Sequence, residues 1–259
     1  MHFYRLAMQK LFDEAAAAYS DAPQQIRVKP SIPVLYFGDY QRYINSPLRV
    51  ITVALNPSNH EFPRENPFER FQSADGVSGA TIPSSPKIMM ALNSYFKTKP
   101  YKWFDSLEPV ISGFKSSYFS TRDNTNTALH TDLLSPVATY PTWSKLEQGD
   151  RDKLAVKGIP LWHDLVRKLR PHIILISVAK PHIAAIKFLG GQRLKKVYTF
   201  SAKPNYPVQH AVVPIDSDHS ADLIFARAAQ MPFGFFRHEE KQLIGQRLRD
   251  VLHNKDKMP

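Results

Sequence analysis

Four short apolar runs, separated by helical or irregular stretches, constrain the fold of this 259-residue chain most strongly. The clearest run, residues 49–55, is rich in β-branched side chains and ends abruptly at Asn56-Pro57-Ser58, as a buried strand does at a turn. Similar runs occupy residues 128–134, 172–178 and 210–215. Because strands that alternate with helices form parallel sheets, the sequence predicts an α/β fold: a three-layer α/β/α sandwich with a central, mainly parallel, four-stranded sheet.

Helical spacing connects the apolar runs. It predicts helices in residues 3–20, 87–96, 143–154, 159–169 and 181–189, and a short strand at 34–37. A last amphipathic helix carries Leu243, Ile244, Leu248, Val251 and Leu252 on one face, which predicts packing on the sheet. No repeat or long linker divides the chain. We therefore expect one domain, with an N-terminal helix and loop extension (1–48), a core (49–236) and the C-terminal helix (237–259).

The charge of the chain is strongly positive, with 34 Lys and Arg against 23 Asp and Glu and a formal net charge of +11. That balance favours a polyanionic partner such as DNA, although a basic surface also serves solubility alone. The chain has no cysteine, which excludes disulfides, thiolate zinc sites, iron–sulfur clusters and a cysteine nucleophile. Lys10, Asp13 and Glu14 interrupt the N-terminal segment, so neither a signal peptide nor a membrane span is expected. We expect a cytoplasmic, nucleoid-associated monomer without metal or cofactor.

The carboxyl ends of the predicted strands are the first place to search for a site, because open parallel sheets bind ligands there. Four polar segments follow the four strands: Asn56-Pro57-Ser58-Asn59, Asp132-Leu133-Leu134-Ser135, Ser177-Val178-Ala179-Lys180 and Asp216-Ser217-Asp218-His219-Ser220. Since parallel strands end at one edge of a sheet, we expect these segments to converge on one cavity.

Two of these segments resemble the signature motifs of the uracil-DNA glycosylase superfamily. In that family the first strand ends in Asp or Asn followed by Pro, and Asn56-Pro57-Ser58 is similar to the branch that carries Asn. The second motif places a His at the end of the last strand, a wedge leucine four residues on and an Arg eight residues on. His219, Leu223 and Arg227 have that spacing, and an aromatic-glycine segment follows at residues 233–236.

The middle of the chain extends the resemblance. Residues 101–104, 129–133 and 138–143 are similar to a bacterial group known only as glycosylase-like, so the likeness covers roughly residues 50–236. One departure lies directly after His219, where Ser220-Ala221-Asp222 stands in place of the family's Pro-Ser-Pro.

The resemblance implies an enzyme that rotates a base out of DNA and hydrolyses its N-glycosidic bond. Asn56 would orient water, His219 would donate to the departing base, and Glu61 is a candidate general base. Leu223 would fill the gap in the base stack. Further assignments are phosphate contacts by Arg227, Ser177, Lys180 and Ser220, and stacking on the base by Phe62. The alternatives stay open: a turn cap for Asn56, a surface histidine for His219, and core packing for Leu223 and Phe62.

Two departures from the uracil-specific pattern bear on the base. Asp132 occupies the place of the Asn that reads uracil, and a carboxylate accepts only, so it suits the amine of cytosine. Ser58 replaces a tyrosine that blocks the 5-position, and His130 is assigned to the same base pocket. We therefore expect a 5-substituted cytosine, hydroxymethylated or glucosylated, with uracil as the second choice. The alternative for Asp132 is a buried carboxylate bonded to backbone.

The same residues bear on three rival functions. No Gly-x-Ser-x-Gly turn supports a serine hydrolase, and neither His60-Glu61 nor His238-Glu239 has a second histidine at metal-ligand spacing. A DNA-binding or modified-base-sensing protein that has lost catalysis on the same fold remains open, because position 56 is an amide and the segment after His219 is altered.

Overall fold

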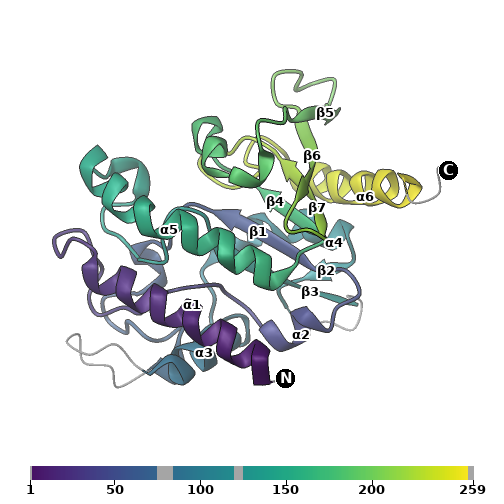
Figure 1. The fold of residues 1–259 in the computed structure, drawn as a ribbon. Coiled ribbons are helices and arrows are strands. Elements are labelled where there is room, and N and C mark those ends of the chain that lie inside the picture. The colour runs from purple at the N-terminus through teal and green to yellow at the C-terminus, as the bar shows by residue number, and fades with distance from the viewer. Residues whose placement is uncertain (1, 75–83, 120–124, 256–259) are drawn as a thin grey trace.

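One seven-stranded sheet forms the centre of the computed structural model, which describes residues 2–74, 84–119 and 125–255 (Figure 1). Its strand order is β2-β3-β1-β4-β7-β6-β5. The strands are β1 Val50–Ala54, β2 Ser116–Ser117, β3 Asn126–Asp132, β4 Ile173–Ile176, β5 Lys195–Tyr198, β6 Val208–Pro214 and β7 Ser220–Phe225.

The sheet is mostly parallel, as predicted, but it has seven strands instead of four. Strands β2, β3, β1, β4 and β7 run parallel, whereas β6 is antiparallel to both β7 and β5. The run predicted at 210–215 is therefore β6, which points the opposite way from the parallel strands. The parallel strand that follows β4 in the sheet is β7, which contains residues of the predicted His219 motif. We call the edge where the parallel strands end the carboxyl edge, and the opposite edge the amino edge.

Helices cover both faces of the sheet (Figure 1). The α-helices are α1 His2–Asp21, α2 Tyr40–Ile44, α3 Ser85–Ser94, α4 Glu108–Gly113, α5 Gln148–Leu169 and α6 His238–Lys255. Shorter 3-10 segments are η1 Asn59–Glu61, η2 Gln72–Ala74, η3 Tyr95–Lys97, η4 Lys102–Ser106, η5 Trp143–Lys145, η6 Lys180–Ala185 and η7 Lys187–Leu189.

The alternation of side chains along β3 shows which helices cover which face. Thr131 points toward α5, because the indole nitrogen of Trp162 donates to its hydroxyl at 3.0 Å. The next side chain back, His130, points to the other face and contacts the ring of Phe104 in η4 at 5.0 Å. Asp132 shares the face of His130, so it lies under η4 and the aromatic residues around it.

Two glycines let helices approach closely. A Cβ atom at Gly158 of α5 would lie 2.0 Å from the carbonyl oxygen of Leu134, in the loop after β3. A Cβ atom at Gly245 of α6 would lie 2.1 Å from the carbonyl oxygen of Val110 in α4. These two contacts hold α5 against the loop after β3 and α6 against α4.

Several predicted helices are confirmed with altered bounds. The first, second and last predicted helices correspond to α1, α3 and α6, and in α6 Ile244 and Leu248 are buried as predicted. The side chains of Val251 and Leu252 lie outside the described residues. The predicted helices 143–154 and 159–169 are joined from Gln148 onward in the single helix α5, which continues through Pro160, whereas Trp143–Lys145 is the 3-10 segment η5. Residues 181–189 are 3-10 turns.

The N-terminal extension pairs with the core. Val28 donates its backbone amide to Ala138 at 3.0 Å, and Arg27 forms an antiparallel bridge with Thr139. Phe37 and His130 exchange both backbone hydrogen bonds, at 2.9 and 3.0 Å, so residues 34–37 contribute one bridge in place of the predicted strand. None of the helices in the described part of the chain combines the length and apolar composition needed to cross a membrane.

Candidate active site and basic groove

Asn56 follows β1 at the carboxyl edge, where the loop after β3 holds its side chain. Its amide nitrogen lies 2.9 Å from the hydroxyl of Thr139, 3.2 Å from the carbonyl of Val137 and 2.8 Å from the carbonyl of Pro57. Its amide oxygen accepts no hydrogen bond from any residue that the structure describes. The side chain is therefore fixed through its donor, and its acceptor stays available to a water molecule or a ligand.

Glu61 lies in η1, five residues beyond Asn56, with its carboxyl group buried. The hydroxyl of Tyr95 donates to that carboxyl group and accepts from the backbone amide of Tyr101 at 3.0 Å. Burial raises the pKa of Glu61 to about 8; Tyr95 and Arg70 oppose the rise, and the neighbouring charge of Asp132 adds to it. At neutral pH Glu61 is therefore mainly protonated, which makes it a proton donor rather than the general base predicted from the sequence.

Asp132 ends β3 beside Ala54, the last residue of β1, and is buried. A chain of buried polar groups leads to it: the hydroxyl of Tyr118 meets that of Thr52, which lies 2.7 Å from Nδ1 of His130. The Nε2 atom of His130 lies 3.6 Å from a carboxylate oxygen of Asp132. Burial raises the pKa of Asp132, and the hydrogen bond and charge of His130 oppose that rise. The partner of Asp132 is thus a histidine, not the backbone.

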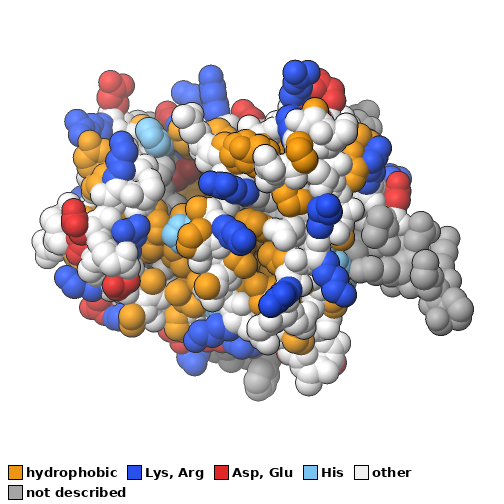
Figure 2. Space-filling view, turned by 90° about the horizontal axis from the view of Figure 1, so that it is seen from above, with side chains coloured by type: hydrophobic (Ala, Val, Ile, Leu, Met, Phe, Trp, Pro, Cys, Tyr) orange, Lys and Arg blue, Asp and Glu red, His pale blue; other side chains and the backbone are white. Residues whose placement is uncertain are grey.

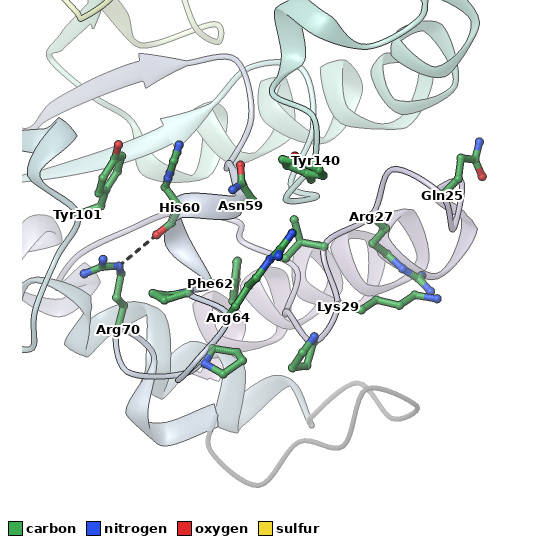
Figure 3. A pocket seen from close by; sticks show the side chains of 14 residues that line it. Gln25, Arg27, Lys29, Asn59, His60, Phe62, Arg64, Arg70, Tyr101 and Tyr140 are labelled. Atoms are coloured by element: carbon green, nitrogen blue, oxygen red, sulfur yellow. Dashed lines mark hydrogen bonds between the residues drawn. The ribbon is translucent and has the colours of Figure 1, made fainter.

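A groove with a volume of about 760 Å³ adjoins η1; Asn59 and His60 line it, whereas Asn56, Glu61 and Asp132 are not part of its lining (Figure 3). Arg27, Lys29, Arg64 and Arg70 line it, and no acidic residue is among its described lining. Aromatic surface comes from Tyr101, Tyr140 and the edge of Phe62. Asn59 and His60 form the part of the wall that belongs to η1, next to Ser58 and Glu61.

Arg70 links the groove to the buried carboxyl group. It donates to the carbonyl oxygens of His60, at 3.3 Å, and of Lys99, and its guanidinium lies 5.8 Å from the centre of the Tyr101 ring. The ring of His60 stacks on the ring of Tyr101, with ring centroids 5.1 Å apart and an angle of 16° between the ring planes. Arg70 is also 3.5 Å from Glu69, so part of its charge is compensated.

His219 does not lie at this site, which corrects the central expectation from the sequence. It immediately precedes β7, whose Asp222 pairs with Ile173 at the start of β4, so it lies at the amino edge. Its Nε2 atom is 2.7 Å from the carbonyl of Pro171, and its ring contacts His172 at 5.7 Å. Asn56 and His219 are therefore on opposite edges of the sheet. His219 is half-buried before a strand rather than on the surface near a helix, and its ring contacts are structural.

The structure also corrects the DNA-binding roles predicted for Leu223 and Ser220. Leu223 is fully buried in β7 opposite Ile174 of β4, so it is a core side chain and cannot enter a base stack without unfolding the strand. Ser220 opens β7 at the amino edge, away from the groove. The physical reason is the hairpin of β6 and β7, which reverses the chain at residues 216–219 and places His219 before a strand instead of after one.

The other predicted residues divide between the core and the carboxyl edge. The hydroxyl of Ser177 is buried and accepts from the backbone amide of Phe233 at 2.8 Å, so it holds a loop. Phe62 stacks on Phe71 with centroids 5.0 Å apart, which makes it mainly a core residue. Lys180 and Arg227 are exposed just beyond β4 and β7, at the carboxyl edge.

Ser58 caps η1 by accepting from the amide of His60 at 3.2 Å, which fixes the turn between Asn56 and Glu61. Arg70, Tyr95 and the cationic residues of the groove are not among the residues predicted from the sequence. A weak signal exists in residues 23–30 and 60–70, which combine several prolines with basic residues, because surface loops often carry binding residues. Their meeting in one groove depends on long-range pairing that local pattern does not reveal.

Basic side chains are also spread over the face seen from above, with hydrophobic side chains between them (Figure 2). Among the described residues no group of three or more His, Asp or Glu side chains is arranged to hold a metal ion. The groups available for chemistry at the carboxyl edge are therefore an amide, two buried carboxyls and cations.

Comparison of the chain with models of known protein families found no matching family, and comparison with curated proteins found no matching relative. The resemblance to the uracil-DNA glycosylase superfamily thus depends on local motifs alone. Of these motifs, Asn56-Pro57-Ser58 has the expected position at a strand end, and the motif beginning at His219 does not.

Proposed function

We propose that this protein is a DNA glycosylase whose reaction centre consists of Asn56, Glu61 and Asp132. One observation carries the proposal: an amide with a fixed nitrogen and an unpaired oxygen lies at the same sheet edge as two buried carboxyl groups. The parallel order β3-β1-β4-β7, with helices on both faces, supports the three-layer arrangement expected of such an enzyme. The net charge of +11 supports DNA as the partner.

The chemistry assigns a separate task to each group. As the bond between the base nitrogen and the sugar C1′ breaks, the electron pair leaves with the base, and positive charge grows on the sugar. Protonated Glu61 donates its proton to the departing base, the role that the sequence had given to His219. Asn56 orients a water molecule through its amide oxygen, and that water adds to C1′. The Glu61 carboxylate then accepts the proton that this water releases.

The base that fits this centre best is a cytosine with a 5-substituent. The Asp132 carboxylate, positioned by His130, accepts from an exocyclic amine, whereas uracil presents an oxygen at the same place. Ser58 is small, and its hydroxyl is engaged with His60, so it leaves space beside the 5-position. Uracil is the second choice.

A base-release assay tests the proposal. Oligonucleotides with uracil, mismatched thymine, 5-hydroxymethylcytosine or its glucosylated form are incubated with protein, and free base and alkali-labile sites are measured. We expect release from a 5-substituted cytosine, and Asn56→Ala should reduce it at least 100-fold, on the order of what removal of one positioned polar group costs. Failure to release any base would refute the proposal.

His219→Ala is the matched control variant. Because His219 lies at the amino edge, this substitution should leave base release within about twofold of the unaltered protein. A loss comparable with that of Asn56→Ala, in a variant that melts normally, would show that the assigned centre is wrong.

The second candidate is a protein that binds modified DNA without cutting it. The observation in its favour is the absence of the motif's histidine from the carboxyl edge, which leaves Glu61 as the donor. Tight binding of a 5-substituted oligonucleotide with no base released would support this function over catalysis.

A further inference from the structure

We infer that the basic groove binds single-stranded nucleic acid, and that unpaired DNA is therefore the substrate class of the proposed enzyme. The groove is formed by Arg27 and Lys29 on the N-terminal loop, Arg64 and Arg70 after η1, and the ring of Tyr140 (Figure 3). The binding claim depends only on these residues. The substrate claim also depends on the proposed function.

The charges in the groove are arranged for a polyanion. Arg27, Lys29 and Arg64 form no ion pair with any carboxylate that the structure describes, so their charge is not compensated locally. Arg27 is held in place by its own contacts: it donates to the carbonyl of Tyr19 at 2.5 Å, and its guanidinium lies 4.6 Å from the centre of the Tyr19 ring. Its Nε atom is buried without a hydrogen-bond partner. Uncompensated cations in a concave surface without acidic lining are typical of a groove that binds the phosphates of a nucleic-acid strand.

The aromatic rings distinguish a single strand from a duplex. Tyr140 is 59% exposed, which is unusual for a large aromatic side chain, and it stands in the groove wall. His60 is exposed as well and is supported from one side by the stacked ring of Tyr101. Rings that lie between cations stack on bases only when the bases are unpaired, because a duplex presents its phosphates and hides its base faces. A volume of about 760 Å³ falls within the range of clefts that enclose small ligands, and it suits a segment of one strand.

The groove also leads to the proposed reaction centre. Arg27 pairs with Thr139 across a backbone bridge, and the hydroxyl of the same Thr139 accepts from the amide of Asn56 at 2.9 Å. On the other wall Arg70 lies behind His60 and raises the positive potential near Glu61. A strand held in the groove therefore lies one residue, Thr139, away from Asn56, and an unpaired nucleotide reaches the centre without the opening of a duplex.

Fluorescence anisotropy with a labelled, unmodified single-stranded oligonucleotide tests the inference, with the same sequence as a duplex for comparison. We expect the single strand to bind at least tenfold more tightly than the duplex. Tyr140→Ala should weaken single-strand binding about five- to 100-fold, since one stacked base contributes that much. Arg64→Ala should weaken it severalfold, whereas Lys168→Ala, which removes one exposed positive charge from the end of α5, should leave it unchanged.

Three results would overturn the inference: equal affinity for the duplex, normal binding by both groove variants, or an equal loss in Lys168→Ala. The substrate contains no modified base, so binding is scored independently of base release. Groove-dependent binding without any base release would leave the inference standing and refute the proposed function. Base release that is faster from duplex than from single strands would refute the substrate class alone.

Discussion

Glu61 combines burial, a single strong hydrogen-bond donor and a neighbouring acid, and these three conditions decide what it can do. Tyr95 donates to it, but a neutral hydroxyl compensates a buried negative charge only in part. The nearest cation, Arg70, already binds two backbone carbonyls and lies close to Glu69. The protonated form of Glu61 is therefore the stable one at neutral pH. Burial raises the pKa of Asp132 as well, but there His130 faces the carboxyl group directly and opposes the rise.

Glu61 should make the stability of the protein depend on pH. A carboxyl whose folded pKa is about 8, against an ordinary value of 4.5, makes the folded state hold more protons than the unfolded state between those values. Stability should therefore fall as pH rises through that window. Glu61→Gln keeps an acceptor for Tyr95 but cannot ionise. At about pH 8.5 the variant should melt several degrees above the unaltered protein, and at about pH 5 it should gain little. For a protein of this size, 1 kcal/mol of stability corresponds to a change of about 2–4 °C in melting temperature.

Glu65→Gln is the control for that measurement, because Glu65 is exposed in the following loop. Its melting curve should run parallel to that of the unaltered protein across the pH range. If Glu61→Gln also ran parallel, the carboxyl of Glu61 would have to be ionised and compensated in the folded protein, and its role as a proton donor would be excluded.

The same protonation should appear in the pH dependence of base release. If Glu61 donates the proton, the rate should be level below pH 8 and fall about tenfold for each further unit above it, as the carboxyl group ionises. A general base would give the reverse, a rate that increases toward pH 8. Single-turnover base release, measured across that range with saturating protein, distinguishes the two.

At the scale of elements, the sequence predicted four strand positions and the outer helices, but it did not predict the direction of β6 or the existence of β7. The run of β6 is apolar and β-branched, which is equally typical of parallel and antiparallel strands. The turn at residues 216–219 is rich in Asp and Ser, a composition that serves hairpins and strand-end loops alike. A parallel β6 would end at the carboxyl edge, and for this reason the sequence predicts His219 at the wrong edge.

The helix α5 is a second element in which prediction and structure differ. The predicted helices ended at residue 154 and began again at residue 159, which would place Pro160 in a first turn, where proline is tolerated. In the structure Pro160 is exposed, and Val156, whose carbonyl loses its partner, has a side chain that is 73% exposed. Water can satisfy that carbonyl on the outer face, so the helix continues. Solvent exposure of one helix face is a tertiary property that local pattern does not contain.

Leu223→Ala tests whether β7 is core or a DNA-reading segment. Because the side chain is fully buried between β4 and β6, its truncation should reduce the free energy of unfolding by about 2–5 kcal/mol. Chemical denaturation measures the loss. Single-strand affinity at a temperature where the variant remains folded should stay unchanged. A variant with normal stability and impaired base release would instead support the predicted role of Leu223, which is to fill the gap in the base stack.

Gly158→Ala tests how α5 supports the site. The added methyl group would lie 2.0 Å from the carbonyl oxygen of Leu134, in the loop whose Val137 and Thr139 hold Asn56. Either the helix or the loop must move, which should cost about 1–3 kcal/mol despite the better helix propensity of alanine. Gly149→Ala in the same helix meets nothing within 4 Å and should be neutral or stabilising. Equal melting temperatures for the two variants would refute the close packing.

At the scale of the whole molecule, a net charge of +11 and a localised groove make different predictions for salt dependence. For single strands, the logarithm of affinity falls with the logarithm of salt concentration by about 0.7 for each phosphate neutralised. If the groove binds the strand, Arg64→Ala should flatten that slope by about 0.7, and Lys168→Ala should leave it unaltered. If diffuse charge dominates, both variants should change alike. Anisotropy titrations between about 50 and 200 mM salt measure the slopes. Two identical slopes would mean that the whole basic surface, rather than one groove, attracts the strand.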